Sequence, residues 1–283
     1  MESETHSAPP VVAVVVVHEP GDWFGETLDA LAAQDYPNLR FLFLVTDGEA
    51  EPVVSLDTIE ATILERLPNA FVRSLGANPG FAGAANEVGR LVEGQNGFFL
   101  FCHDDIAPDP DAVRMLVEEL YRSNAGAVGP KFVEWDDPSV LRSVGLGLDR
   151  FGVVDQPIEE GEVDQEQHDG VRDVFVLPTA CLLVRADLFR ELDGFDPALD
   201  LYGEDIEFCW RAHHSGARVV VAPSARVRHR GRLDERRPDI NRIRVAARHR
   251  LRTVATMTGA ARLPGRTLEL VLLTVAEIVV GMF

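Results

Sequence analysis

The regular alternation of apolar runs with helical segments most constrains what this chain can fold into. Residues 11–17 (VVAVVVV) and 39–45 (LRFLFLV) are continuous apolar runs, typical of strands buried on both faces. Between them, residues 24–34 place apolar side chains at helical spacing. The alternation continues with helices expected near 56–66, 82–93 and 109–123 and strands at 70–75, 97–102 and 125–130. This order predicts an α/β fold with a mostly parallel central sheet and helices on both faces.

The rhythm changes in the second half of the chain. From residue 131, short alternating stretches predict hairpins and therefore a smaller antiparallel portion. The acidic segment 155–173 lacks periodicity and is expected to be a surface loop. Further strands are expected at 174–184 and 218–222, with a helix near 204–214 between them. Loop side chains at the carboxyl ends of the parallel strands are then the first candidates for ligand binding.

The charge of the chain is divided unevenly. The net charge is −19, yet residues 211–266 hold 15 arginines against three acidic residues, so this segment carries +12 and the remainder −31. The acidic bulk argues against nucleic acid as a partner, because polyphosphate affinity needs clustered cations. The basic segment is either a solvated face or a surface that meets an anionic membrane.

The two ends of the chain differ in character. Residues 1–9 are polar and expected to be disordered, whereas 233–283 combine a basic amphipathic helix at 240–258 with a mostly apolar end. The last 16 residues span about 24 Å as a helix, which is short of a bilayer core of about 30 Å. Two interpretations stay open, a docked helix and the start of a longer membrane protein. The expected apolar stripe of the amphipathic helix comprises Ile240, Ile243, Ala247, Leu251 and Val254.

Two adjacent carboxylates, Asp104 and Asp105, follow the strand expected at 97–102. A hard divalent metal with oxygen ligands fits such a pair, and one of the two is expected to bind it directly. The alternative is that one of them caps the helix that follows. The three cysteines are widely spaced and form no disulfide framework, which favours a reducing compartment.

Three further segments could carry chemistry. In 75–89 (LGANPGFAGAANEVG), Gly80 and Gly83 allow close approach of the backbone to a ligand, or simply form a tight turn. Glu204 and Asp205 open the helix expected at 204–214, as a general base or as charges favoured by the helix dipole. His229 lies among arginines, as a ligand or as a structural side chain.

The order of these segments is more specific than any one of them. A strand start, "NPGFAGAANEVG", "HDD", "GFDPALDLYGEDIEFCWR" and "RVVVAPSARVRH" together resemble the family 2 glycosyltransferases with the GT-A fold, over residues 10–232. The resemblance implies a nucleotide-binding half at 10–130 and an acceptor half at 131–232. The segments "HDDIAPDPDAV" and "GPKFVEWDDP" are similar to the N-terminal catalytic domain of large bacterial membrane-associated glycosyltransferases. Residues 233–283 would then be membrane-proximal.

The resemblance also implies roles for individual residues. Asp205 matches the catalytic base, with Glu204 beside it, and Asp105 matches the ligand of Mn²⁺ or Mg²⁺, with His229 completing the metal site. Residues expected to contact the nucleotide-sugar are Asp47, Asn78, Gly80, Phe81, Asn86, Asp104 and Thr179. The first position of the metal motif is His103, where the family carries Asp.

The function implied is an inverting, metal-assisted hexosyl- or deoxyhexosyltransferase. A nucleotide-diphosphate sugar is the expected donor, and a cell-envelope glycan or lipid-linked molecule the expected acceptor. The implied location is cytoplasmic, at the cytoplasmic face of the membrane. One alternative is a catalytically degenerate domain that acts as a membrane-side scaffold. The other is a nucleotidyltransferase, which is disfavoured because "VHEPGDW" after the first strand lacks a Gly-rich basic loop.

Overall fold

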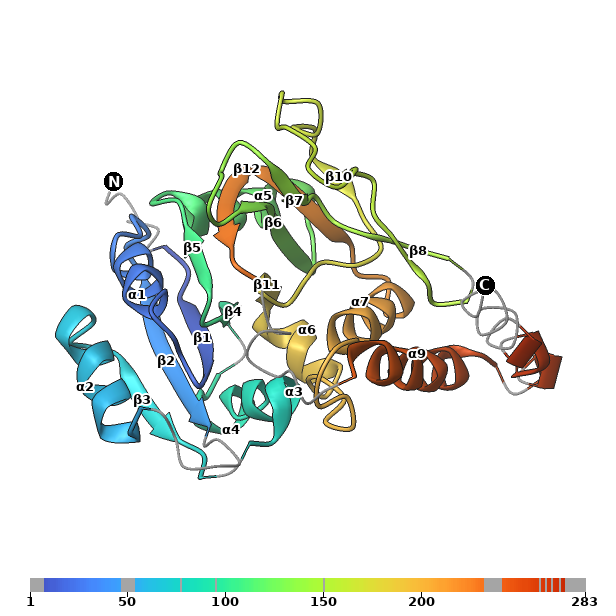
Figure 1. The fold of residues 1–283 in the computed structure, drawn as a ribbon, viewed down its shortest axis with the longest axis horizontal. Coiled ribbons are helices and arrows are strands. Elements are labelled where there is room, and N and C mark those ends of the chain that lie inside the picture. Colours follow the sequence, from blue (N-terminus) through green and yellow to red (C-terminus); the bar gives the residue numbers. More distant parts are fainter. Residues whose placement is uncertain are drawn as a thin grey trace, which may run out of the picture.

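The computed structural model describes residues 8–46, 54–76, 78–94, 96–149, 151–231 and 241–259, with four short pieces between 261 and 272. A curved sheet fills the centre, helices pack around it, and one long helix projects to the side (Figure 1). Three expectations fall outside the described residues, namely the order of residues 1–7, the position of Asp47 and most of the apolar end. No helix in the described residues is long and apolar enough to cross a membrane.

The first half of the chain builds a parallel sheet. Its strands are β1 (Val11–His18), β2 (Leu39–Thr46), β3 (Phe71–Ser74) and β4 (Phe98–His103). β1 is central and pairs in parallel with both β2 and β4. Because the three strands run in one direction, the side chains that end them meet at a single edge: His18 pairs with Thr46, and Val16 with His103.

The second half extends the same sheet. β11 (Cys181–Arg185) is antiparallel to β4 and to β6 (Ala127–Glu134), and β6 runs parallel to β12 (Val219–His229). The order is β10-β12-β6-β11-β4-β1-β2-β3, with β5 (Ile106–Pro108) on β12, β7 (Leu141–Ser143) on β6 and β10 (Arg172–Asp173) at the edge. A separate hairpin joins β8 (Gly147–Leu148) to β9 (Val154–Asp155). The expected smaller antiparallel portion is therefore present.

Helices cover both faces, as the apolar strands predict. On one face lie α1 (Phe24–Ala32), α2 (Leu56–Arg66) and α5 (Ala112–Ser123). On the other lie α3 (Gly80–Ala85), α4 (Val88–Leu91), α6 (Ala186–Glu191) and α7 (Glu204–His214). Neighbouring β1 residues alternate between them: Val15 joins the core under α1, and Val14 the core under α3. A strand buried on both faces needs this continuous apolar run.

Three elements differ from their expected bounds. The helix expected at 82–93 is divided into α3 and α4 at Asn86. The strand expected at 174–184 begins only at Cys181, because the chain enters it through a loop that contains Pro178. β12 runs past the expected 218–222 as far as His229, with an irregular register between Ala222 and Arg226. That extension carries His229 to the same edge as the ends of β1 and β4.

The long helix α9 (Arg242–Met257) is where it was expected, and Val254 of the expected stripe is buried, but the rest of its buried face differs from the prediction. His249, Thr253 and Val254 are buried, whereas Leu251 of the expected stripe is 39% exposed. The hydrogen bond between Nδ1 of His249 and the carbonyl oxygen of Tyr202 keeps this face of the helix buried. Apolar spacing alone does not reveal such a contact.

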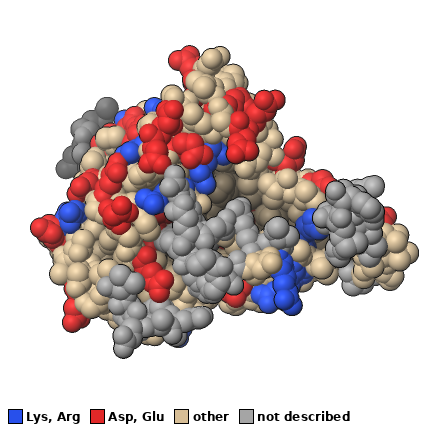
Figure 2. All heavy atoms as spheres, in the orientation of Figure 1, with Lys and Arg blue, Asp and Glu red and all other residues tan. Residues whose placement is uncertain are grey.

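The acidic segment 155–173 lies on the surface but is fastened to the sheet. The buried ammonium of Lys131 on β6 lies 2.7 Å from an Asp164 carboxylate oxygen and 2.5 Å from one of Asp169. Figure 2 shows acidic side chains gathered over this part of the surface. Lys131 therefore ties two of these carboxylates to the core.

Candidate active site

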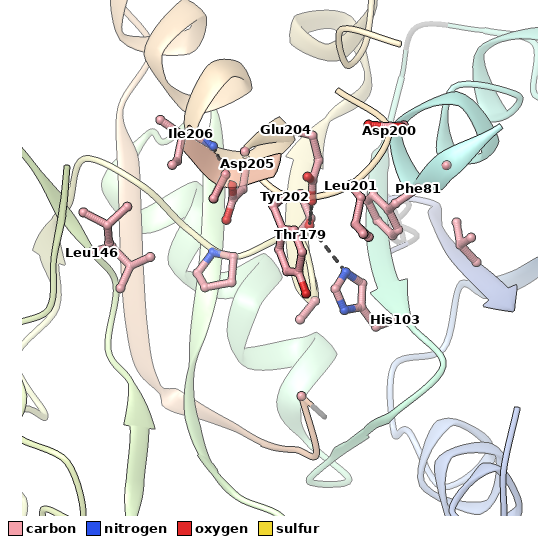
Figure 3. A pocket seen from close by; sticks show the side chains of 18 of the residues that line it. Phe81, His103, Leu146, Thr179, Asp200, Leu201, Tyr202, Glu204, Asp205 and Ile206 are labelled. Atoms are coloured by element: carbon pink, nitrogen blue, oxygen red, sulfur yellow. Dashed lines mark hydrogen bonds between the residues drawn. The ribbon is translucent and has the colours of Figure 1, made fainter. Parts of the chain in front are cut away.

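A cavity of about 740 Å³ lies at the carboxyl ends of β1, β2 and β4, within the range of small-molecule sites. Side chains from both halves of the chain line it (Figure 3). Nine of the residues singled out from the sequence are among them: Asn78, Gly80, Phe81, Asp104, Asp105, Thr179, Glu204, Asp205 and His229. Segments that are distant in the sequence thus share one site.

Three potential metal ligands meet at one wall of the cavity. Nδ1 of His103 lies 3.9 Å, and Nε2 of His229 3.4 Å, from Oδ1 of Asp105. One ligand atom from each residue falls within 4.8 Å of the others. The backbone N–H of Gly231 donates to Oδ2 of Asp105 at 3.1 Å, which orients the carboxylate and leaves Oδ1 facing the two imidazoles. Two imidazoles and a carboxylate suit a divalent transition metal.

His103 was not expected to be a ligand, because it replaces an Asp of the family pattern. Its ring packs edge-on against Phe81, with centroids 4.8 Å apart, and its Nε2 lies 3.5 Å from Oγ1 of Thr179. These contacts direct Nδ1 toward Asp105. Imidazole is also a metal donor, although it favours transition metals over Mg²⁺, so the substitution keeps a donor at this position and changes its metal preference. The place of His103 in the metal motif was the sequence signal that could have revealed it as a potential ligand.

Asp104 and Asp105 face different partners, as expected for neighbours. Oδ2 of Asp104 accepts the backbone N–H of His18 at 2.9 Å, and the Asp104 carbonyl accepts the hydroxyl of Thr27 at 3.2 Å. The Asp104 side chain is only 2% exposed. It therefore joins the end of β1 to the turn that carries Asp105.

A second wall consists of the loop before α3 and the ends of β1 and β2. Nδ1 of His18 lies 2.9 Å from Oγ1 of Thr46. Nε2 of the same imidazole lies 3.4 Å from the amide nitrogen of Asn78. Oδ1 of Asn78 accepts the backbone N–H of Gly80 at 2.9 Å. His18 was missed as a candidate, although its place at the end of β1 was a usable signal.

Gly80 permits a close approach between two loops. Its φ is +73°, and a Cβ atom there would lie 2.2 Å from the carbonyl oxygen of Asp200. The next residue, Phe81, donates its backbone N–H to that same carbonyl at 3.2 Å. Any side chain at position 80 would separate this loop from the turn before α7.

Glu204 and Asp205 enter the cavity from the first turn of α7. Oγ1 of Thr179 donates to Oε1 of Glu204 at 2.8 Å (Figure 3), while Oε2 has no hydrogen-bond partner among the described residues. Burial and the adjacent Asp205 charge raise the pKa of Glu204 to about 8. Burial raises the pKa of Asp205 to about 6, less than for Glu204, and the N–H of Ile206, 2.8 Å away, favours its charged form. The N–H of Ile206 stabilises the charged form of Asp205, so Asp205 is the better placed of the two carboxylates to accept a proton.

Among the described residues, Asn86 is the expected donor-binding residue that does not line the cavity. Asn86 uses its side-chain amide for both backbone groups of Phe195: Nδ2 donates to the carbonyl at 2.8 Å, and Oδ1 accepts the N–H at 2.9 Å. It braces the loop before α7. Asp47 lies outside the described residues.

The cavity also reaches the β8–β9 hairpin and the long helix α9. The β8–β9 hairpin contributes Gly152, Val153 and Val154, and α9 contributes Ala247 and Arg250. A second hollow, lined in part by the acidic segment, continues beyond His229 and shares five residues with the cavity: Arg142, Leu146, Gln156, Pro178 and His229. The site therefore extends from the potential metal ligands to the β8–β9 hairpin and α9.

A parallel first half, a second half with antiparallel and parallel pairs, and a cavity where the two meet are typical of the GT-A fold of glycosyltransferases. Residues 9–260 match the sequence model of the family described as glycosyltransferase-like family 2, and the chain belongs to this family. The fold class and the family resemblance expected from the sequence are thereby confirmed.

Similar proteins include bacterial enzymes of glycan synthesis. The chain is 25% identical over 229 residues to the O-antigen biosynthesis protein RfbC of Myxococcus xanthus, and the match spans 78% of this chain but only 17% of RfbC. It is 28% identical over 240 residues to the N-acetylglucosaminyl-diphospho-decaprenol L-rhamnosyltransferase of Mycobacterium tuberculosis, covering 78% of this chain and 75% of that protein.

Solved structures share the fold at low identity. The crystal structure of GalNAc-T7 with UDP, GalNAc and Mn²⁺ has a TM-score of 0.63 at 13% identity, covering 78% of this chain and 43% of that one. The complex of S. aureus TarS residues 1–349 with UDP has a TM-score of 0.59 at 15% identity, covering 93% and 70%.

Proposed function

We propose that this protein transfers a hexosyl or deoxyhexosyl group from a nucleoside-diphosphate sugar to a hydroxyl of a glycan or lipid-linked acceptor, with inversion at the anomeric carbon. One observation carries the proposal. The metal-ligand cluster of His103, Asp105 and His229 and the carboxylate pair of Glu204 and Asp205 line the same cavity. The leaving diphosphate needs a metal that stabilises its charge, and the attacking hydroxyl needs a carboxylate that accepts its proton.

Mn²⁺ and Mg²⁺ are the metals expected from the sequence, and the donor set of two imidazoles and one carboxylate fits Mn²⁺ better, because Mg²⁺ prefers oxygen ligands. Asp105 would be the central ligand, with His229 and His103 on either side. When bound, the metal supplies a Lewis acid that stabilises the charge developing on the leaving diphosphate. The chain's own part is to bind the donor against the loop of Asn78, Gly80 and Phe81, with Asp104 holding β1 in place.

Asp205 is proposed as the general base. An acceptor hydroxyl must lose its proton as it attacks, and Asp205 is ionised at a pH where Glu204 still holds a proton. Glu204 carries that proton beside Thr179, so it adds no second negative charge next to the diphosphate. A single displacement of this kind inverts the anomeric configuration.

The acceptor is proposed to enter between α9 and the β8–β9 hairpin, with the acidic segment forming part of its cleft. Arg250 faces that end of the cavity, and Figure 2 shows basic side chains gathered over α9. Such a surface suits an anionic membrane or a phosphate-bearing acceptor. The named activity of the mycobacterial relative supports a lipid-linked envelope acceptor, met at the cytoplasmic face of the membrane.

Asp205→Asn tests the proposal. The variant keeps the shape of the side chain but cannot accept a proton, so transfer should fall by about 10²–10⁴-fold. Donor binding should persist, measured as the rise in melting temperature with UDP or dTDP and Mn²⁺, because Asp205 is not a proposed metal ligand. If the protein were a scaffold without catalytic activity, Asp205→Asn would instead remove no measurable function.

The donor is identified by the same melting measurement. Wild-type protein is screened against nucleoside diphosphates and their sugars with Mn²⁺, Mg²⁺ or EDTA. A ligand at 100 times its Kd should stabilise the fold by about 2.7 kcal/mol. A shift that EDTA abolishes supports metal-assisted donor binding, and the absence of any shift contradicts it.

A further inference from the structure

The turn before α7 has an unfavourable backbone that needs support from outside. Tyr202 has a φ of +62° and Gly203 a φ of +96°, so two consecutive residues are left-handed immediately before Glu204. Glycine adopts this conformation readily, but a tyrosine does so at a cost. Because Glu204 and Asp205 follow directly, relaxation of Tyr202 would rotate the start of α7 and displace both carboxylates.

His249 on α9 supplies a contact at this point. Its side chain is buried, and Nδ1 lies 2.7 Å from the carbonyl oxygen of Tyr202. A carbonyl only accepts, so Nδ1 carries the hydrogen. A guanidinium nitrogen of Arg248 lies 2.8 Å from Nε2 and donates to it. One neutral tautomer of His249 satisfies both contacts.

The same turn also contacts the loop on the donor side. The carbonyl of Asp200 accepts the backbone N–H of Phe81 at 3.2 Å. The carboxylate of Asp200 lies 3.4 Å from Nε2 of His249 and 3.5 Å from a guanidinium nitrogen of Arg248. The segment from Asp200 to Gly203 is therefore held between α9 and the loop of Gly80, with the carboxylate pair at its end.

We infer that His249 is a positioning residue for the transfer reaction. Its hydrogen bond to Tyr202 holds the left-handed turn and so determines where Glu204 and Asp205 stand. His249 is not among the residues that line the cavity. Its effect on catalysis rests on the proposed function, whereas its effect on the turn does not. It also makes α9 part of the catalytic unit, beyond the boundary at residue 232 expected from the sequence.

Two variants of His249 separate its hydrogen bond from its bulk. His249→Leu fills the space but removes the donor, whereas His249→Asn retains an N–H donor at the position of Nδ1. The matched control is Val254→Ala, because Val254 is also buried on α9, packs near Gly152 and is not among the cavity-lining residues. Two quantities are measured: amide hydrogen exchange of residues 201–208, and kcat and KM for the donor.

His249→Leu should lower kcat by about tenfold or more with donor KM nearly unchanged, and should speed exchange at the start of α7. His249→Asn should retain most of the wild-type kcat and most of the protection from exchange. Val254→Ala should change kcat and exchange much less than His249→Leu does. The inference is overturned if the Leu and Ala variants behave alike, or if Asn restores nothing. If wild-type protein transfers no sugar, the proposed function fails, and hydrogen exchange still decides the role of His249.

Discussion

At the scale of single residues, the environment of the two adjacent carboxylates makes them different. Both belong to the first turn of α7, yet Glu204 is buried against Thr179 and Asp205 accepts a backbone N–H. Burial and the neighbouring charge raise the pKa of Glu204 above that of Asp205. Two carboxylates with separated pKa values can hold different protonation states at one pH, which lets one act as a base while the other stays neutral.

Glu204→Gln should make the stability of the metal-free protein less dependent on pH. The folded-state pKa of Glu204, about 8, exceeds its ordinary value of 4.5, so the folded state binds this proton more tightly. Stability from this group is present below pH 4.5 and is lost as pH rises toward 8. Gln does not titrate and can still accept from Thr179. Melting curves in EDTA should show the variant gaining on wild type between pH 5 and pH 8.5, by about 2–4 °C for each kcal/mol.

An equal difference between wild type and Glu204→Gln at both pH values would contradict the raised pKa. Among single residues, Glu204, Asp205 and Asp105 were recognisable because their types and order follow a family pattern. His18 and the bracing role of Asn86 were not, because both depend on contacts with strands and loops far along the chain.

At the scale of elements, the loop before α3 and the turn before α7 depend on each other. Their contact is the approach of Gly80 to Asp200, which leaves no room for a Cβ atom. The sequence indicates a glycine-rich loop that opens a helix. It does not indicate which segment the loop packs against, because that partner lies about 120 residues further on.

Gly80→Ala should therefore weaken both the fold and donor binding. The expected loss of stability is about 1–3 kcal/mol, from strain and overpacking. Gly76→Ala is the matched control, since Gly76 has nearly the same φ, +71°, but nothing within 4 Å of an added Cβ. Chemical denaturation of the two variants separates backbone strain from the clash. Equal losses would show that the close approach to Asp200 costs nothing.

At the scale of the whole molecule, the metal-ligand cluster exists only because two distant strands end together. His103 ends β4 and His229 ends β12, and Asp105 lies in the turn after β4. β6 and β11 separate β4 from β12 in the sheet order. The curvature of the sheet and the pairing of β5 with the end of β12 bring these ligands together.

His229→Ala should raise the Mn²⁺ concentration needed for half-maximal stabilisation by a nucleoside diphosphate, by about 10–100-fold. Loss of one of three protein ligands weakens the site but leaves Asp105 and His103 in place. His213→Ala is the control, because its imidazole bonds to the carbonyl of Phe175 at 3.0 Å and is not in the cluster. An unchanged Mn²⁺ requirement in His229→Ala would exclude His229 as a ligand.

The sequence by itself determined the fold class, because alternating apolar runs and helical segments leave few ways to bury a sheet on both faces. It also determined the family, through the order of short motifs, and nine of the residues that line the cavity. Only the tertiary structure decided which side chains meet. The extension of β12 to His229, the orientation of α9 with His249 inward and the support of the Tyr202 turn all arise from contacts between segments distant in the sequence. Local periodicity carries no information about such contacts.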